Sequence, residues 1–338
     1  MTRALILHRA GPAMSVQDMG RPGQLGLGLS RGGAADRQAM AEGAALLGQG
    51  EDAAAIEMAG MGGTFEATED MRIALTGAPM RASLDGAPVT WGASHLLRAG
   101  QRIEIGPVLS GVYGYLHVGG GIAAPVILGA RGAHLAAGIG AALVEGDRLP
   151  IGPDTAGAEA GFALAVEDRF AGGTVRALAG PQTPMFAQDE IARFETTRFT
   201  RDPRGNRMGV RLTPEGAGFQ TGAGLSILSE VVVPGDIQIG GDGTPMVLLA
   251  ECQTTGGYPR IGTVLPSDLP RVAQAPPGAQ LRIRFVDRAE ALAAEAAAAT
   301  ARRALSCRLT RLLRDPRDMR DLLAYQLIGG VTDGAAEG

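Results

Sequence analysis

The 338-residue sequence contains no lysine, and all 31 of its basic residues are arginine. This absence excludes a Walker-type phosphate lysine, a Schiff-base lysine and an attached biotin. Cysteine is almost as scarce, because only Cys252 and Cys307 are present, far apart and outside any CxxC or Cys/His cluster. No disulfide framework, zinc site or other metal site is therefore predicted, and this cysteine usage is typical of a reducing cytosol.

Strong positive charge and long apolar runs are missing as well. The formal net charge is −4, and no basic cluster is interleaved with aromatic residues. A nucleic-acid backbone would have little to attract it, so nucleic acid is excluded as a partner. The apolar run near the N-terminus is too short for a signal peptide, and no later segment approaches the length of a membrane span. We expect a cytoplasmic protein with no membrane partner.

Glycine and proline are abundant, with 52 and 20 residues, while aromatic residues make up only 4%. This composition favours a mainly β fold with many turns between short strands, and the length favours two domains. A turn followed by an alternating strand at 99–105 is echoed at 277–283. Two series of strands are predicted: 5–8, 54–58, 64–67, 72–76, 89–91, 102–105 and 114–118, then 174–178, 209–212, 227–229, 236–239, 246–250 and 280–286.

Helices are fewer. One is predicted at 36–47, where Asp36 is placed to cap the N-terminus and Gly48 to close the C-terminus. Alanine, arginine and leucine dominate residues 288–313, which predicts a long C-terminal helix. Shorter helical segments are expected at 183–194, 266–274 and 319–328, with a frayed tail at 329–338.

Two glycine-rich segments are predicted to be loops. Residues 15–29 are too polar for the core, and residues 128–149 form a long ordered loop. His134 in the second loop is an outside candidate for a functional histidine, with a solvated side chain as the alternative. His117 stands in an alternating strand and is predicted to be a core or interface residue.

The segment QTTGGYP at 253–259 crowds hydrogen-bonding side chains onto a turn directly after an apolar strand. A strand delivers its last residues to a fixed position, and paired glycines allow a backbone to approach a ligand closely. The segment is therefore interpreted as part of a site. A plain β-turn is an equally open interpretation.

Four motifs together carry a resemblance to a known family: SVQDMGR at 15–21, GAAD at 33–36, NRMG at 206–209, and PGDIQ at 234–238 continuing to QTTGGYP. GGGI at 119–122 and EGDRL at 145–149 lie between them. In this order the motifs resemble the allophanate hydrolase subunit 2 family, from about residue 5 to residue 286. The family includes the C-type chain of bacterial 5-oxoprolinase, the protein antagonising the sporulation kinase inhibitor Kip, and the carboxyltransferase domain of urea carboxylase. Glu251 stands where the family usually has aspartate.

The resemblance implies two cyclophilin-like β-barrel domains followed by a C-terminal Ala/Arg-rich helix. The expected boundaries are 1–168 for the first barrel with its Gly-rich loops, 169–287 for the second barrel, and 288–338 for the helix and tail. It also implies partners, namely a subunit-1 (B-type) protein and an A-type 5-oxoprolinase subunit.

The implied function is a subunit of an ATP-dependent hydrolase of a small amide or lactam, most simply the C-type subunit of 5-oxoprolinase, which contributes to opening 5-oxoproline to L-glutamate. ATP with Mg²⁺ would act in the complex, and no biotin would be attached to this chain. Two alternatives stay open. One is a biotin-dependent carboxyltransferase subunit acting on urea or a similar small amide, and the other is a non-catalytic regulatory binding protein of a kinase or kinase inhibitor.

An amide substrate needs a donor for its carbonyl oxygen and an acceptor for its N–H, and the glutamines and threonines of the last motifs offer both. Arginines of the family motifs are suited to anchoring a carboxylate or phosphate. Asp36 is equally a helix cap, and Asp18 equally a turn residue. The predicted catalytic residues are Asp18, Asp36, Gln253 and Thr255. The predicted substrate-binding residues are Gln17, Arg21, Arg207, Gln238, Thr254 and Tyr258.

Overall fold

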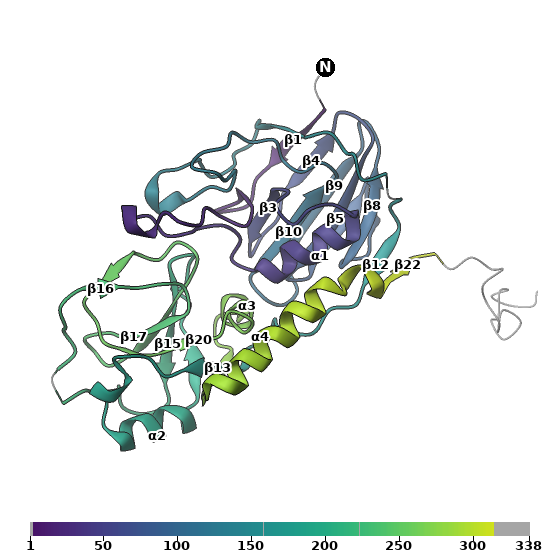
Figure 1. The fold of residues 1–338 in the computed structure, drawn as a ribbon. Helices are drawn as coiled ribbons and strands as arrows, with labels where there is room; N and C mark the ends of the chain where they lie inside the picture. The colour runs from purple at the N-terminus through teal and green to yellow at the C-terminus, as the bar shows by residue number, and fades with distance from the viewer. Residues whose placement is uncertain (1–2, 158, 223, 314–338) are drawn as a thin grey trace, which may run out of the picture.

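The computed structural model describes residues 3–157, 159–222 and 224–313. The chain forms a first part made of two β-sheets, a second part built around a closed barrel, and a long helix that runs from one part to the other (Figure 1). The helix predicted at 319–328 and the tail at 329–338 lie outside the described residues.

The two sheets of the first part enclose one core. Side chains from both sheets meet there, with Leu5 and Phe65 from one and Ile73 and Leu116 from the other, all fully buried. Successive side chains of a strand point to opposite faces of its sheet, so every second one enters this core. The first sheet has the order β11 (Arg148–Pro150), β1 (Ala4–Arg9), β4 (Thr64–Ala67), β9 (Arg102–Val108), β6 (Met80–Leu84) and β7 (Ala87–Pro88). The second has the order β2 (Ser15–Gln17), β3 (Ala55–Ala59), β10 (Tyr113–Val118), β5 (Met71–Gly77), β8 (Ala93–Leu97), β12 (Phe162–Leu164) and β22 (Leu309–Arg311).

Helix α1 (Arg37–Leu47) packs against the second sheet. Asp36 caps it by accepting a hydrogen bond from the Ala39 amide at 3.1 Å, and Gly48 ends it with a left-handed φ of 62°. His117 on β10 is buried beneath this helix, as predicted, and donates to Thr76 on β5 at 2.8 Å. The Thr76 hydroxyl in turn donates to the Ala39 carbonyl.

Burial lowers the pKa of His117 to about 3, whereas in the unfolded chain it is near 6.5. The unfolded state therefore binds more protons between these values, and His117 reduces the free energy of unfolding as pH falls below 6.5. We expect a contribution of about 1.4 kcal/mol per pH unit, measured by urea unfolding at about pH 7.5 and about pH 5.5. The variant His117→Gln, which removes the titrating group, should show a shallower pH dependence, and equal slopes in the two proteins would contradict this account.

The second part closes into a barrel because β13 and β21, more than 100 residues apart in sequence, pair in parallel along their length. The barrel order is β13 (Gly173–Leu178), β20 (Arg260–Val264), β17 (Asp236–Ile239), β18 (Pro245–Leu248), β15 (Gly209–Pro214), β14 (Phe199–Arg201) and β21 (Gln280–Val286). Helix α2 (Gln188–Thr196) places Phe194 in the core, where the centroid of its ring lies 5.1 Å from the ring centroids of Phe199 and Phe219. Outside the barrel lie α3 (Leu269–Gln274) and a small sheet of β16 (Glu230–Val231) and β19 (Thr255–Gly256).

Helix α4 (Arg288–Arg303) starts beside the barrel, where Asp287 caps it, and ends next to the first part (Figure 1). The chain then makes the short helical turn η4 (Leu305–Arg308) and adds β22 to the edge of the second sheet by pairing with β12. Three more short turns complete the described chain: η1 (Leu25–Leu27), η2 (Leu135–Ala137) and η3 (Thr183–Met185). Within the described part of the chain, no helix is both long and apolar enough to cross a bilayer.

The predicted mainly β fold with a C-terminal helix is confirmed, and its barrel closes in the second part. Several local predictions were wrong. The long helix ends at Arg303 and not at 313. Leu305 is buried against α1, and residues 309–311 form a strand that pairs with β12, so neither continues the helix. No strand forms at 89–91 or 227–229, both of which the structure describes. Residues 15–29 include the strand β2, and their polar side chains enter the interior where hydrogen bonds satisfy most of their polar atoms.

Candidate functional site

Arg207 lies at the centre of the contact between the two parts. It precedes β15 of the barrel, and its guanidinium pairs with Glu57 on β3 of the first part and with Glu251, which follows β18. Its Nε donates to Glu251 at 2.7 Å, and its NH2 donates to the Gly33 carbonyl at 2.6 Å. All three charged side chains are buried. Burial by itself lowers the pKa of Arg207, but the two carboxylates raise it above its ordinary value, so the guanidinium stays charged.

Glu57 extends this network to the start of α1. Its carboxylate accepts hydrogen bonds from the Ala35 amide at 2.8 Å and from the Tyr115 hydroxyl at 2.7 Å. The same hydroxyl accepts a hydrogen bond from the Asp36 amide at 2.8 Å. Burial, together with the charge of Glu57, raises the pKa of Tyr115 well above its ordinary value, so the phenol remains protonated and keeps donating to Glu57.

Arg169, in the segment between β12 and β13, forms a second charged bridge. Its Nε donates to Asp36 at 2.7 Å, and its two terminal nitrogens donate to the carboxylate of Glu42 on α1 at 2.9 and 2.8 Å. Gln274 on α3 also donates to Asp36, at 2.8 Å. Asp36, predicted to be catalytic, is thus fully enclosed, and its contacts are those of a helix cap and a buried ion pair.

Gln17, Asp18 and Arg21 converge on Gly132 in the 128–149 loop. Gln17 is fully buried and its Nε2 donates to the Ala133 carbonyl at 3.1 Å. Arg21 is also buried, and its NH2 donates to the Gly132 carbonyl at 2.5 Å. A Cβ on Gly132 would lie 2.7 Å from Asp18 Oδ1 and 3.1 Å from Gln17 Oε1. Glycine is therefore needed at 132 for the loop to approach these side chains so closely.

Three predicted substrate-binding residues each hold a buried atom with no hydrogen-bond partner among the described residues. These atoms are Gln17 Oε1, Arg21 NH1 and Gln238 Nε2. The same holds for Arg201 Nε in the barrel. Leaving a buried polar atom unpaired costs free energy, and native proteins contain few such atoms. Gln17 Oε1 and Arg21 NH1, on the two side chains that converge on Gly132, are an acceptor and a donor of the kind that a bound amide requires for its own N–H and carbonyl oxygen.

His134 is buried and not solvated, which corrects the alternative considered from the sequence. Its Nδ1 accepts from the Ala137 amide at 3.3 Å, so Nε2 carries the proton and donates to Ser30 Oγ at 2.8 Å. Burial lowers the pKa of His134, although the Glu251 carboxylate 4.0 Å from Nδ1 opposes this effect. In this arrangement the neutral imidazole is a donor to Ser30 and does not act as the base that would activate a serine nucleophile.

Gln253 and Gln238 form a second group, on the barrel. Gln253 is exposed after β18, and its Nε2 donates to Oε1 of the buried Gln238 on β17 at 3.0 Å. A Cβ on Gly256 would lie 2.2 Å from Gln238 Nε2, so the glycine permits a close approach here. The other predicted residues of this segment are half-buried or exposed: Thr254, Thr255 on β19, and Tyr258.

Glu251 connects the two groups of predicted residues. Glu251, two residues before Gln253, accepts a hydrogen bond from the Ala136 amide at 3.0 Å, and Ala136 belongs to the same loop that covers Gln17. Arg207 lies within this joint rather than on an open surface. The structure therefore places Gln17, Asp18 and Arg21 together and Gln238 beside Gln253, with the Arg207 network between the parts.

Four charged or phenolic residues of this network were not predicted: Glu42, Glu57, Tyr115 and Arg169. Glu57 had a usable signal, because it is a single charge inside an apolar strand and a buried charge requires a partner. Arg169 had none, since it lies in a polar segment that looks like a surface linker in the sequence.

Comparison with known proteins places the chain in a family. Residues 27–286 match the family described as carboxyltransferase domain, subdomain A and B. The chain is 35% identical over 294 residues to the C-type subunit of 5-oxoprolinase from Escherichia coli K12, covering 86% of this chain and 94% of that protein. It is 33% identical over 283 residues to the same subunit from Haemophilus influenzae, covering 82% and 89%. The chain belongs to the carboxyltransferase domain A and B family, and the resemblance seen in its motifs is confirmed.

Solved structures agree with this family. The structure of TTHA0988 superposes with a TM-score of 0.76 at 31% identity, covering 84% of this chain and 56% of that one. Urea carboxylase of Kluyveromyces lactis superposes with a TM-score of 0.80 at 21% identity, covering 93% of this chain and 31% of that one. The second likeness concerns the fold alone. The chain spans only about half of the first protein and a third of the second.

Proposed function

We propose that this chain is the C-type subunit of a cytoplasmic, ATP-dependent complex that opens the lactam of 5-oxoproline to L-glutamate. Its partners would be a subunit-1 (B-type) protein and an A-type subunit. The names of the two curated relatives support this proposal, since each is matched over most of its length. The structural observation that carries it is the pair of unpaired buried atoms on Gln17 and Arg21.

These atoms suit the substrate. A lactam has one N–H and one carbonyl oxygen, and 5-oxoproline adds a carboxylate. Gln17 Oε1 would accept from the ring N–H, while Arg21 NH1 would donate to an oxygen of the substrate. Asp18 lies beside Gln17 at Gly132, and its two oxygens accept from the Gly20 and Arg131 amides at 2.8 and 2.6 Å. Each carboxylate oxygen retains a second lone pair, so Asp18 is able to accept a proton or orient a water molecule.

ATP would supply the free energy and the phosphoryl group that activates an unreactive amide. Because the sequence has no lysine, arginines and backbone amides would have to hold its phosphates. No group of three or more His, Cys, Asp or Glu side chains among the described residues is arranged to hold a metal ion. Mg²⁺ would therefore arrive with the nucleotide.

A second candidate is a carboxyltransferase that acts on urea or a similar small amide. The description of the matched family, carboxyltransferase domain, favours it. Without lysine the chain would take the carboxyl group from biotin carried by another protein. The pair Gln238 and Gln253, which offers amide donors and acceptors to a small amide, is compatible with this reaction.

A substrate screen separates the two. The chain is purified with its B-type and A-type partners and supplied with ATP, Mg²⁺ and either 5-oxoproline or urea, with and without avidin. Both arms also contain bicarbonate and a biotin carboxylase with its biotinylated carrier protein, which would supply the carboxyl group to urea. We expect phosphate release that depends on 5-oxoproline, yields glutamate and is insensitive to avidin. Turnover of urea that avidin abolishes would instead establish the carboxyltransferase.

A further inference from the structure

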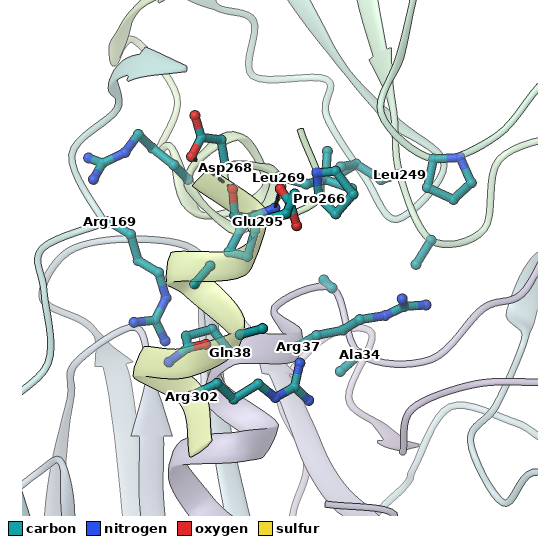
Figure 2. A pocket seen from close by; sticks show the side chains of 18 of the residues that line it. Ala34, Arg37, Gln38, Arg169, Leu249, Pro266, Asp268, Leu269, Glu295 and Arg302 are labelled. Atoms are coloured by element: carbon teal, nitrogen blue, oxygen red, sulfur yellow. Dashed lines mark hydrogen bonds between the residues drawn. The ribbon is translucent and has the colours of Figure 1, made fainter. Parts of the chain in front are cut away.

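A large cavity lies between the two parts of the chain, enclosed by α1, the barrel and α4. Its volume is about 1110 Å³, which is more than a small lactam requires and is in the range of cofactor-sized ligands. Figure 2 shows its two unlike walls. Leu249, Pro266 and Leu269 line one side, together with the carboxylates of Asp268 and Glu295, which are bound to Arg176 and the Ser267 amide. Arg37 of α1 and Arg302 of α4 extend from the other side.

Arg37 differs from the other arginines that line this cavity. Its guanidinium has no hydrogen bond or ion pair among the described residues, although the side chain is half-buried. The other guanidinium groups of the lining each have at least one partner: Arg21 with Gly132, Arg31 with Met19, Arg169 with Asp36 and Glu42, Arg176 with Asp268, Arg271 with Gly172, Arg284 with Glu290, Arg302 with Glu51 and Arg308 with Ala165. As far as the structure describes the chain, Arg37 is thus a cation whose five donors have no protein partner.

Arg37 is also surrounded by like charge. Arg31 and Arg302 both contact Met19, through its carbonyl at 3.0 Å and its sulfur at 3.9 Å, which holds the two guanidinium groups on the same side of the cavity. Burial is the largest cause that lowers the pKa of Arg37, to about 10, and the charges of Arg31 and Arg302 lower it further. Glu51 pairs with Arg302 and, among the described residues, with neither Arg31 nor Arg37.

An anion with several charges would remove this repulsion. A guanidinium binds phosphate with two parallel hydrogen bonds, and three of them around one space suit a polyphosphate better than a single carboxylate. The apolar wall opposite suits a nucleobase. We propose that this cavity binds ATP, with the phosphates on Arg31, Arg37 and Arg302 and the base against the apolar wall; this inference rests on the proposed function.

The location connects the two substrates. Arg21 lines the same cavity while its NH2 holds Gly132 beside Gln17. A nucleotide held by Arg37 would therefore lie next to the proposed lactam site, as transfer of a phosphoryl group to the amide requires.

Binding to the full chain tests the proposal directly. Calorimetric titration in the presence of Mg²⁺ uses ATP, inorganic tripolyphosphate and adenosine as separate probes. We expect ATP to bind more tightly than tripolyphosphate, and adenosine to bind most weakly. Arg37→Gln should weaken ATP and tripolyphosphate by about tenfold or more, because charge-assisted hydrogen bonds are lost. The control Arg98→Gln, at an exposed arginine paired with Asp70, should leave both affinities unchanged.

A measurement of thermal stability distinguishes a specific loss of ATP binding from unfolding of the variant. Since Arg37 is repelled by its neighbours and has no partner among the described residues, Arg37→Gln without ligand should unfold at the same temperature as the wild type or higher. Failure of the chain to bind ATP, or equal ATP affinity in Arg37→Gln, would overturn the inference. If ATP binds through Arg37 but the complex shows no turnover of 5-oxoproline, the proposed function fails and the nucleotide site stands. If instead the complex is active and its KM for ATP is unchanged by Arg37→Gln, the proposed function stands and the nucleotide site fails.

Discussion

Replacing Arg207 with methionine is expected to destabilise the protein by about 3–5 kcal/mol. The substitution keeps an unbranched apolar stem but leaves Glu57 and Glu251, both buried, as two carboxylates without their shared cation. Removing one partner of a buried ion pair is costly because the remaining charge has lost both water and its counter-ion. Urea unfolding at neutral pH measures the difference.

A matched control is available three residues away. Arg204 pairs with Asp202 at 2.7 Å in an exposed position, so Arg204→Met should leave the unfolding midpoint unchanged. In the Arg207→Met background, adding Glu57→Gln and Glu251→Gln should recover part of the lost stability, because it removes the unpaired charges. The deficit of Arg207→Met should also shrink as pH falls, since the stranded carboxylates then take up protons. An unchanged midpoint in Arg207→Met would show that this network does not hold the two parts together.

The largest expected effect on activity comes from Arg21. Replacing it with glutamine removes NH1, a buried donor that has no partner among the described residues and is free to bind an oxygen of the substrate. Deleting one such preorganised donor lowers turnover by about 100-fold to 1000-fold in other hydrolases. We therefore expect kcat/KM for 5-oxoproline of the assembled complex to fall by about 100-fold or more in Arg21→Gln.

The control for this variant is Arg131→Gln in the neighbouring loop. Arg131 is exposed, and its guanidinium bonds only to the Ala124 carbonyl among the described residues. This variant should retain activity. Arg21 also bonds to Gly132, so assembly with the partners and the unfolding midpoint of Arg21→Gln are measured in parallel. Wild-type kcat/KM in an intact Arg21→Gln complex would remove Arg21 from the substrate site.

The motifs allowed more of the site to be predicted than the strand pattern alone. Gln17, Asp18 and Arg21 are close together in the sequence, so their shared location follows from local geometry. The pairing of Arg207 with Glu57, 150 residues apart, does not, because periodicity gives the buried face of a strand but not the element that meets it. For the same reason the closure of the barrel by pairing of β13 with β21 could not be predicted from the sequence.

Local propensity failed where tertiary contacts overrode it. The Ala/Arg-rich run to 313 has the composition of one helix, yet the burial of Leu305 and the pairing of residues 309–311 with β12 end the helix early. The polar composition of residues 15–29 predicted a loop outside the core. Gln17 and Arg21 are nevertheless buried, because they donate hydrogen bonds to the 128–149 loop. The unpaired atoms that carry the proposed function become visible only once these contacts are known.

The most direct test of the whole account is the stoichiometry of product formation by the reconstituted complex. Phosphate and glutamate are quantified together after 5-oxoproline and ATP are supplied to the B-type and A-type partners, with and without this chain. We expect both products to appear in equal amounts, only when the chain is present, and Arg21→Gln to suppress both. Undiminished glutamate formation by the partners alone, or no phosphate release dependent on 5-oxoproline with all three chains assembled, would contradict it.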